Sequence, residues 1–342
     1  MKKITAHQLP AGVITGVGSL PFIDPHIAIQ FVAKHCPMLP FWPQLPRRDA
    51  GEGIVPQALG SLIRYLEPAT KPFCWQIRRG LQGEFHRELW ENDARLIPET
   101  AGGFFSFEGA LGDGLFPDAI ALKAQSEGPL TLAHCIFSED EPIVRLPGWL
   151  DHIAEFIARH ATWQISRLQR WGKPVIFFID EPSIATAIAS SGGDLPLIMS
   201  ALSKVIDAIH EGGAIAGLHC CAPLPSDVLG DLKIDLLSFD AHLPLEEKSW
   251  RHLARAVLGR GGTIAFGLVP TNSRAELNEA ECFNHWLRLS ALAGEIDQVA
   301  RQTIVTATCG LGLASVETAN QVFTQCQQIG DRIRELAKVT AP

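Results

Sequence analysis

The stretch PVIFFIDEP, residues 174–182, begins as a run of apolar and β-branched side chains and ends on two carboxylates. Amphipathic helical patterns precede and follow it, at Leu150–Trp171 and Leu195–Glu211. A short buried strand that alternates with helices is the repeating unit of a parallel sheet. The region around PVIFFIDEP therefore predicts a fold of the α/β class.

The same alternation extends over most of the chain. Its apolar runs predict strands at Gly12–Leu20, Leu39–Leu45, Ala119–Pro129, Pro174–Pro182, Ala214–Cys220, Ile234–Ala241, Gly262–Pro270 and Thr303–Leu311. Further helices are predicted at Leu245–Arg260, Arg274–Leu292 and Glu317–Ala337. Eight such strand–helix units predict a closed (β/α)8 TIM barrel, and we expect one catalytic barrel over residues 1–342.

One stretch departs from the alternation. Residues 53–118 are rich in aromatic residues and glycine, as in KPFCWQI and AGGFFSFEGAL. This composition predicts a β-hairpin excursion between the second and third strands, placed as a lid over the mouth of the barrel.

Composition limits the classes of partner. The net charge is -8, and nucleic acid is bound by basic surfaces, so we expect no nucleic-acid partner. The start, MKKITAHQLPAG, lacks the apolar core of a secretory signal, and the apolar runs are too short to cross a bilayer. We therefore expect a cytoplasmic protein without a membrane partner, in which the eight cysteines are reduced.

Polar and reactive side chains gather where the predicted strands end. These residues are Ser19, Asp180, Glu181, His219, Cys220, Cys221, Asp240 and Cys309. Barrel enzymes carry their chemistry at the C-terminal ends of the strands, whereas a purely structural barrel needs no such residues there. The distribution favours an enzyme.

The stretch GLHCCAP, residues 217–223, contains two candidate metal ligands. Side chains alternate faces along a strand, so His219 and Cys221 point the same way and Cys220 points the other. Asp240 and Cys309 end two further predicted strands. Two thiolates, an imidazole and a carboxylate suit zinc in tetrahedral geometry, which makes these four residues candidate zinc ligands.

Other interpretations of these residues stay open. Cysteines and a histidine on an apolar strand can be ordinary core residues. A vicinal disulfide between Cys220 and Cys221 is a second alternative, although such rings are strained and a reducing cytosol disfavours them. His242 can share the face of Asp240, as a substitute ligand or as a residue behind the site.

The chain resembles the catalytic barrel of cobalamin-independent methionine synthase, in the superfamily shared with uroporphyrinogen decarboxylase. The matching pieces are TGVGSLP, GPLT, IDEP, HCC followed by FDA, and CGLG, in the family's order over most of the chain. The family's large enzyme carries an additional N-terminal barrel, so the resemblance is to its short, single-barrel members.

The resemblance implies a zinc site. The family's zinc ligands fall on His219, Cys221 and Cys309, and Asp240 stands where the family has a glutamate. In the family, zinc binds the thiol of homocysteine. A thiol bound to zinc loses its proton and becomes a nucleophile at neutral pH, so the implied reaction is methyl transfer to that sulfur, giving methionine.

The resemblance also implies a pocket for the amino acid. Asp180 falls on the carboxylate that binds the substrate ammonium group, and Glu52 on a second such carboxylate, with a solvated charge as the alternative. In GVGSLP, the loop with Gly18 and Ser19 resembles the family's binding site for the substrate carboxylate. Glu181, beside Pro182, is instead expected to cap a helix.

The methyl donor departs from the large enzyme's pattern. The family's proposed general acid, a histidine after the seventh strand, has no counterpart in GLVPTNSR, residues 267–274, and of the folate-contacting regions only GPLT remains. Transfer from cobalt expels no amine. A methylcorrinoid, free or on a corrinoid carrier protein, is therefore favoured over methyl-tetrahydrofolate.

Several functions are compatible with these residues. The leading hypothesis is a zinc-dependent homocysteine methyltransferase. The acceptor can instead be another small thiol, as in coenzyme M methyltransferases, or the chain can be a zinc- and thiol-amino-acid-binding relative without activity. A decarboxylase of the uroporphyrinogen type is disfavoured, because it needs basic side chains for several carboxylates and uses no zinc.

Overall fold

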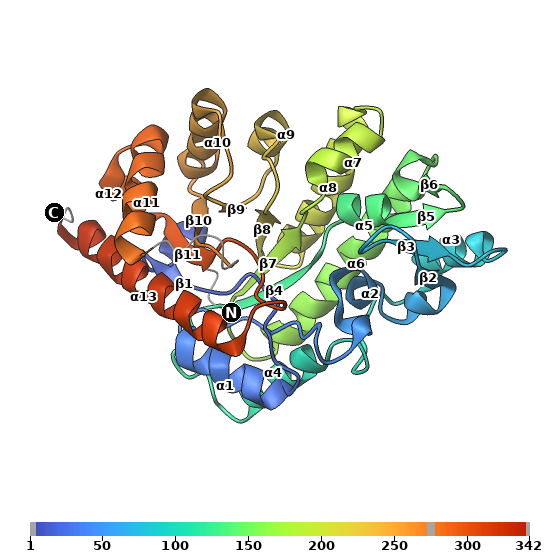
Figure 1. Ribbon diagram of the computed structural model, residues 1–342, viewed down its shortest axis with the longest axis horizontal. Helices are drawn as coiled ribbons and strands as arrows, with labels where there is room; N and C mark the ends of the chain where they lie inside the picture. Colours follow the sequence, from blue (N-terminus) through green and yellow to red (C-terminus); the bar gives the residue numbers. More distant parts are fainter. Residues whose placement is uncertain (1–4, 272–277, 340–342) are drawn as a thin grey trace.

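A seven-stranded, all-parallel sheet forms the centre of the molecule (Figure 1). The structure is a computed structural model that describes residues 5–271 and 278–339. The strands follow the order β1-β11-β10-β9-β8-β7-β4 and so make up part of a barrel wall. They span β1 (Val13–Ile14), β4 (Leu122–Glu127), β7 (Val175–Asp180), β8 (Ile215–Cys220), β9 (Leu236–Asp240), β10 (Thr263–Val269) and β11 (Thr303–Ala307).

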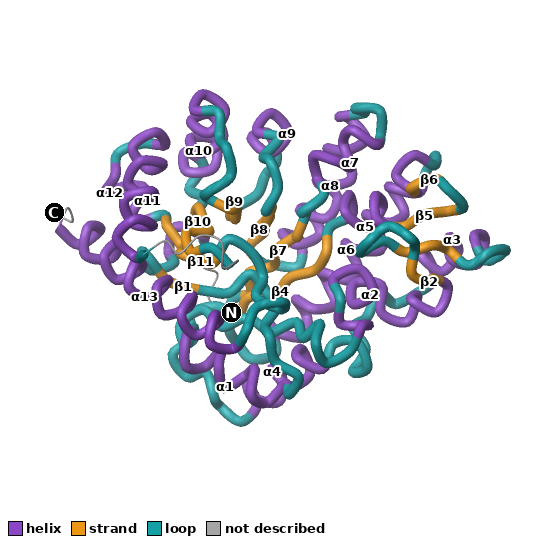
Figure 2. Tube along the Cα trace, viewed as in Figure 1, coloured by secondary structure: helices purple, strands orange, loops and turns teal. Residues whose placement is uncertain are grey.

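Helices surround the outer side of this sheet, as Figure 2 shows. They span α1 (Pro25–His35), α2 (Ile54–Leu59), α3 (Gln82–Glu91), α4 (Gly102–Gly112), α5 (Pro129–Cys135), α6 (Trp149–Gln169), α7 (Ile184–Ser190), α8 (Leu195–Glu211), α9 (Ser226–Asp231), α10 (Glu247–Gly259), α11 (Glu279–Ala293), α12 (Ile296–Arg301) and α13 (Val316–Val339). Short 3₁₀ helices span Ala6–Gln8, Ala50–Glu52, Gly60–Tyr65 and Ile143–Arg145.

The strands are buried on both faces, which explains their continuous apolar sequences. In β7, Phe177 and Ile179 belong to the large apolar cluster that includes the helices. Their neighbours Ile176 and Phe178 belong to a second, smaller apolar cluster inside the curved sheet. Alternation along each strand therefore decides which side chains face the interior, and Asp180 continues the inward face of β7.

The sheet has seven strands, so the structure shows part of the predicted barrel and not its closure, because the second predicted strand does not join the sheet as a regular strand. Between β1 and β4, Leu39–Leu45 makes only two isolated bridges, Ser19 with Gln44 and Phe41 with Lys123. Pro40 and Pro43 lie within this stretch and have no N–H to donate, which prevents a continuous ladder. The segment fills the gap without becoming a strand of the sheet.

The other predicted strands each contain a strand of the sheet, although Gly12–Leu20 contributes only the two residues of β1, and the predicted helices overlap α6, α8, α10, α11 and α13. Boundaries shift by a few residues, except at α8, which spans Leu195–Glu211 as predicted. Asp194 fixes that start, because its carboxylate accepts a hydrogen bond from the backbone N–H of Leu197 at 3.1 Å. The predicted start of the helix at Arg274 lies outside the described residues.

The excursion at residues 53–118 contains the predicted hairpin, and it contains more helix than strand. Strands β2 (Leu66–Pro68) and β3 (Trp75–Ile77) pair antiparallel. With β5 (Ile136–Ser138) and β6 (Glu141–Pro142) they form a separate four-stranded sheet to one side of the molecule (Figure 1). The lid role assigned to this excursion stays a prediction.

Among the described residues, no helix is both long enough and apolar enough to cross a bilayer.

Candidate metal centre

Three of the four predicted ligands meet at the C-terminal ends of the strands. His219 lies near the end of β8, Cys221 follows that strand, and Cys309 lies two residues beyond the end of β11. Their ligand atoms all lie within 4.8 Å of one another, and the Sγ atoms of Cys221 and Cys309 are 3.7 Å apart. The group offers two sulfurs and one imidazole nitrogen, which is a donor set that zinc accepts.

His219 is oriented toward this group by its neighbour on β9. His219 and Ser238 are direct partners in the β8–β9 ladder, and Nδ1 of the ring lies 2.9 Å from the Ser238 hydroxyl. Its other nitrogen, Nε2, is buried and has no hydrogen-bond partner among the described residues. A ring held through one nitrogen with the other free is the usual arrangement of a metal-ligating histidine.

The sulfurs of the two cysteines in the cluster are hydrogen-bonded to each other. The hydrogen bond between their sulfurs lowers the pKa of Cys309, with His219 adding to the effect. The same hydrogen bond, with burial, raises the pKa of Cys221. The thiolate, which a lowered pKa favours, is the form of cysteine that binds metals.

Cys220 is separate from the cluster, as the strand alternation predicts. Its side chain is completely buried, and its Sγ donates to the backbone carbonyl of Ala222 at 3.4 Å. Burial raises the pKa of this thiol to about 12. All eight cysteines are free, so the vicinal disulfide of Cys220 and Cys221 is not formed.

Asp240, the fourth predicted ligand, lies outside the compact group. It is the last residue of β9, and its Oδ1 accepts a hydrogen bond from the backbone N–H of His242 at 2.9 Å. Desolvation raises its pKa. His242 is also engaged, with Nε2 at 2.8 Å from the carbonyl of Leu268 and its ring stacked on His285. The structure therefore does not place either side chain as a ligand.

Asp180 lies beside the cluster on the inward face of the sheet. It pairs with His219 in the β7–β8 ladder, and both residues line a small internal cavity. Its side chain is 7% exposed, and Oδ1 has no hydrogen-bond partner among the described residues. Burial raises its pKa to about 6. This position suits the predicted contact with a substrate cation.

Glu52, the second predicted ammonium-binding carboxylate, is buried and is bound by protein donors. Its buried carboxylate forms an ion pair with Arg48 and accepts hydrogen bonds from the backbone N–H groups of Leu45 (3.1 Å) and Gly102 (3.2 Å). Both oxygens are thus occupied by protein donors. These contacts connect the loop after Leu45 to the start of α4. The predicted contact of Glu52 with an ammonium group stays a prediction.

Ser19 lies against the turn that follows Cys309. Its Oγ accepts a hydrogen bond from the backbone N–H of Gly312 at 3.2 Å. A Cβ on Gly310 would come within 2.1 Å of that oxygen, which explains the glycine beside the ligand. Gly18 instead faces Gln44, whose backbone N–H donates to the Gly18 carbonyl at 3.1 Å. Ser19 therefore brings the loop that is predicted to bind the substrate carboxylate next to the turn after Cys309.

Glu181 caps a helix, in agreement with the interpretation given to it above. Its oxygens accept from the backbone N–H groups of Leu130 and Thr131 and from the Thr131 hydroxyl, at 2.7–2.9 Å. These donors start α5. A Cβ on Gly128 would lie 2.2 Å from Glu181 Oε1, so only glycine fits there.

Sequence reasoning missed three buried polar residues around the site, namely Lys123, Glu127 and Ser238. Lys123 donates to the carbonyl of Val17 at 2.6 Å and to Gln125 at 2.9 Å. Burial lowers its pKa to about 8. A signal was present, because LKAQSE carries a polar residue at every second position of a strand that is buried on both faces.

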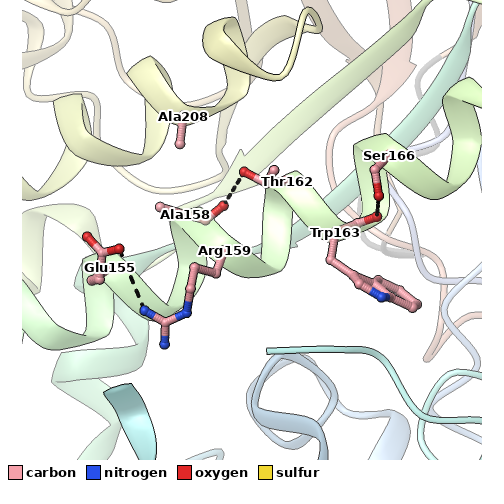
Figure 3. A pocket seen from close by; sticks show the side chains of 7 residues that line it. All are labelled: Glu155, Ala158, Arg159, Thr162, Trp163, Ser166 and Ala208. Carbon is pink, nitrogen blue, oxygen red and sulfur yellow. Dashed lines mark hydrogen bonds and ion pairs between the residues drawn. The ribbon is translucent and has the colours of Figure 1, made fainter. Parts of the chain in front are cut away.

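A depression on the surface lies apart from this site. Figure 3 shows a shallow depression of about 360 Å³ between α6 and Ala208 of α8, lined on α6 by residues such as Glu155, Arg159 and Trp163. Arg159 is paired with Glu155 there. None of the predicted site residues lines this depression.

No protein-family model matches the chain, and neither does any curated protein. Among solved structures, the chain is similar to D-psicose 3-epimerase from Clostridium cellulolyticum H10, with a TM-score of 0.40, 11% identity, and coverage of 69% of this chain and 83% of that one. It is also similar to an endo-beta-1,4-mannanase double mutant from Cellulomonas fimi, with a TM-score of 0.38, 16% identity, and coverage of 67% and 57%. Likenesses this distant bear on neither the activity nor the substrate.

Proposed function

We propose that the protein is a zinc-dependent methyltransferase that transfers a methyl group to a thiol, with homocysteine as the acceptor and methionine as the product. The proposal rests on one observation above all. The ligand atoms of His219, Cys221 and Cys309 lie within 4.8 Å of one another, at the C-terminal ends of parallel strands, and Nε2 of His219 is without a partner among the described residues.

The residues present fit a zinc ion. His219, Cys221 and Cys309 would hold it, which leaves the fourth position of a tetrahedral site for a substrate or for Asp240. When bound, zinc supplies a Lewis acid that lowers the pKa of a coordinated thiol and so provides a thiolate nucleophile at neutral pH.

The surroundings of the cluster fit an amino-acid thiol. Asp180 supplies a buried carboxylate with an unpartnered oxygen beside the cluster, and it attracts the ammonium group of the acceptor. Ser19, whose Oγ accepts a hydrogen bond from the backbone N–H of Gly312, would contact the carboxylate of the acceptor through its hydroxyl. Both side chains therefore orient the sulfur of the acceptor toward the cluster.

The donor proposed is a methylcorrinoid, free or on a carrier protein. In the transfer, the sulfur lone pair forms the new S–C bond while the cobalt–carbon bond breaks and its electron pair stays on cobalt. No amine leaves, so no general acid is needed. The sequence 267–274 contains no histidine for that purpose, although residues 272–274 lie outside the described structure.

Methionine formation tests the proposal. Zinc-loaded protein incubated with methylcobalamin and homocysteine is expected to form methionine, and Cys309→Ser is expected to lower the rate at least 100-fold, about 3 kcal/mol of transition-state stabilisation. Cys220→Ser is the matched control, because Cys220 is separate from the cluster. If methionine forms with methyl-tetrahydrofolate and not with methylcobalamin, the donor is methyl-tetrahydrofolate and not a methylcorrinoid. Zinc binding without turnover on either donor would contradict the methyltransferase assignment and identify a binding protein.

A further inference from the structure

Two cysteines outside the candidate metal centre lie opposite each other at the start of the small sheet. Strands β3 and β5 pair in parallel beside α5, with Trp75 opposite Ile136 (Figure 1). Cys74 and Cys135 come immediately before these two residues, so they occupy matching positions on neighbouring segments. Neighbouring strands are about 4.8 Å apart, and a disulfide joins Cα atoms about 4.4–6.8 Å apart. The backbone therefore brings the two cysteines within the span of a disulfide.

The side chains of the two cysteines are also in contact. Burial raises the pKa of Cys135 to about 12, and its charge interaction and hydrogen bond with the thiol of Cys74 add to the rise. Both thiols are free. Cys74 is 5% exposed and Cys135 8%, whereas the other buried cysteines are 2% exposed or less. The pair thus combines mutual contact with some access to solvent.

The tip of the β2–β3 hairpin, directly before Cys74, gives this access. Lys71 and Phe73 are exposed, and Phe73 has a φ of 62°, in the left-handed region. A bulky side chain is strained there, and such strain concentrates at functional segments. The ammonium group of Lys71 lies 3.2 Å from Nε2 of His134, the residue before Cys135. A cation beside a thiol favours the reactive thiolate.

We propose that Cys74 and Cys135 form a redox-responsive disulfide that fastens the β2–β3 hairpin to the end of α5, with a small disulfide such as oxidised glutathione as the oxidant. The thiolate of Cys74 attacks one sulfur of the oxidant, whose S–S bond breaks and releases a small thiolate. Cys135 then attacks the Cys74 sulfur of this mixed disulfide and expels a second small thiolate. The protons of the two protein thiols pass to the two released thiolates. Two protein thiols are thus oxidised and one small disulfide is reduced.

This disulfide would connect the hairpin to the mouth of the central sheet. Helix α5, which Cys135 ends, begins near Thr131, whose hydroxyl donates to Glu181 at 2.7 Å. Cys135 also forms a hydrogen bond with Ser183, the residue before α7. Oxidation therefore fixes the hairpin relative to segments that start at the strand ends. The inference does not depend on the proposed function, because it uses none of the residues of the candidate metal centre.

Peptide mapping of the wild-type protein tests the proposal. The protein is equilibrated with an excess of oxidised glutathione, alkylated in denaturant and digested with trypsin. Residues 65–78 are expected to be joined to residues 124–145, because Pro72 blocks cleavage after Lys71. Each peptide contains one cysteine, so the mass of the joined pair identifies the bond, and dithiothreitol is expected to separate it. A protein in which both cysteines stay free, or carry only glutathione, would overturn the proposal.

Variants and the unfolding temperature test the position of the bond. Cys74→Ser and Cys135→Ser are each expected to abolish the joined peptides, and Cys220→Ser, whose thiol faces the Ala222 carbonyl, to keep them. The disulfide closes the long loop of residues 74–135, so oxidation is expected to raise the unfolding temperature of the wild type by at least about 3 °C. The same treatment is expected to leave the unfolding temperature of Cys74→Ser unchanged. An equal shift in both proteins would overturn the fastening of the hairpin.

Discussion

A single hydrogen bond prepares His219 for its role in the cluster. The Ser238 hydroxyl holds Nδ1 at 2.9 Å, and Nε2 is left without a partner among the described residues. The bond follows from the register of β8 and β9, because the two residues are direct ladder partners. Second contacts of this kind fix the ring and the proton position of a metal-ligating histidine.

Ser238→Ala is therefore expected to lower zinc affinity about 10- to 100-fold without changing the donor set. Competition with a chromogenic chelator measures the affinity. Ser126→Ala is a matched control, since Ser126 is a buried strand-end serine on β4 with no hydrogen-bond partner among the described residues. Equal affinities for wild type and Ser238→Ala would show that the hydroxyl does not orient the ring.

A series of buried hydrogen bonds connects helix α6 to Trp42 and to the backbone at Ala94. Trp42 donates to Gln164 at 3.1 Å, Gln164 contacts Nε2 of His160 at 2.9 Å, and Nδ1 of His160 lies 2.8 Å from the carbonyl of Ala94. Only a neutral ring satisfies this series, with Nδ1 donating and Nε2 accepting. Burial accordingly lowers the pKa of His160 to about 4.

The hydrogen bonds of His160 predict that the protein loses folding stability in mild acid. The unfolded state takes up a proton near pH 6.5 and the folded state only near pH 4, so the contribution of His160 is complete above 6.5 and is lost as the pH falls toward 4. Between pH 7 and 4.5 the loss is about 2 to 3 kcal/mol. The free energy of unfolding, measured with urea for wild type and His160→Gln at both pH values, isolates the contribution of His160. If the free energies of the two proteins change equally with pH, the prediction is wrong.

At the scale of the whole molecule, strand positions follow from sequence because each buried parallel strand is a short apolar run. The exception, Leu39–Leu45, has such a run but also carries Pro40 and Pro43, and it forms isolated bridges. The proline content was visible in the sequence, and it outweighs the apolar pattern. Strand ends were predicted well enough to bring His219, Cys221 and Cys309 together.

The pairing of buried charges was less predictable. Glu52 pairs with Arg48, which lies in the same loop, and with backbone N–H groups of Leu45 and Gly102. Contact with residue 102 depends on the tertiary fold, so no local pattern reveals it. The burial of Glu127 also depends on the tertiary fold, through the β4–β7 register, although the polar residues at every second position of LKAQSE were a signal in the sequence.

The proposed zinc site is tested most directly by the zinc content of the purified protein and of its cysteine variants, measured by plasma mass spectrometry. We expect about one zinc ion per chain in wild type and in Cys220→Ser. Cys309→Ser and Cys221→Ser are expected to bind less than about a tenth of that, because each removes one of the three ligands. A wild-type protein that binds no zinc, or a Cys309→Ser variant that retains it in full, would contradict the account.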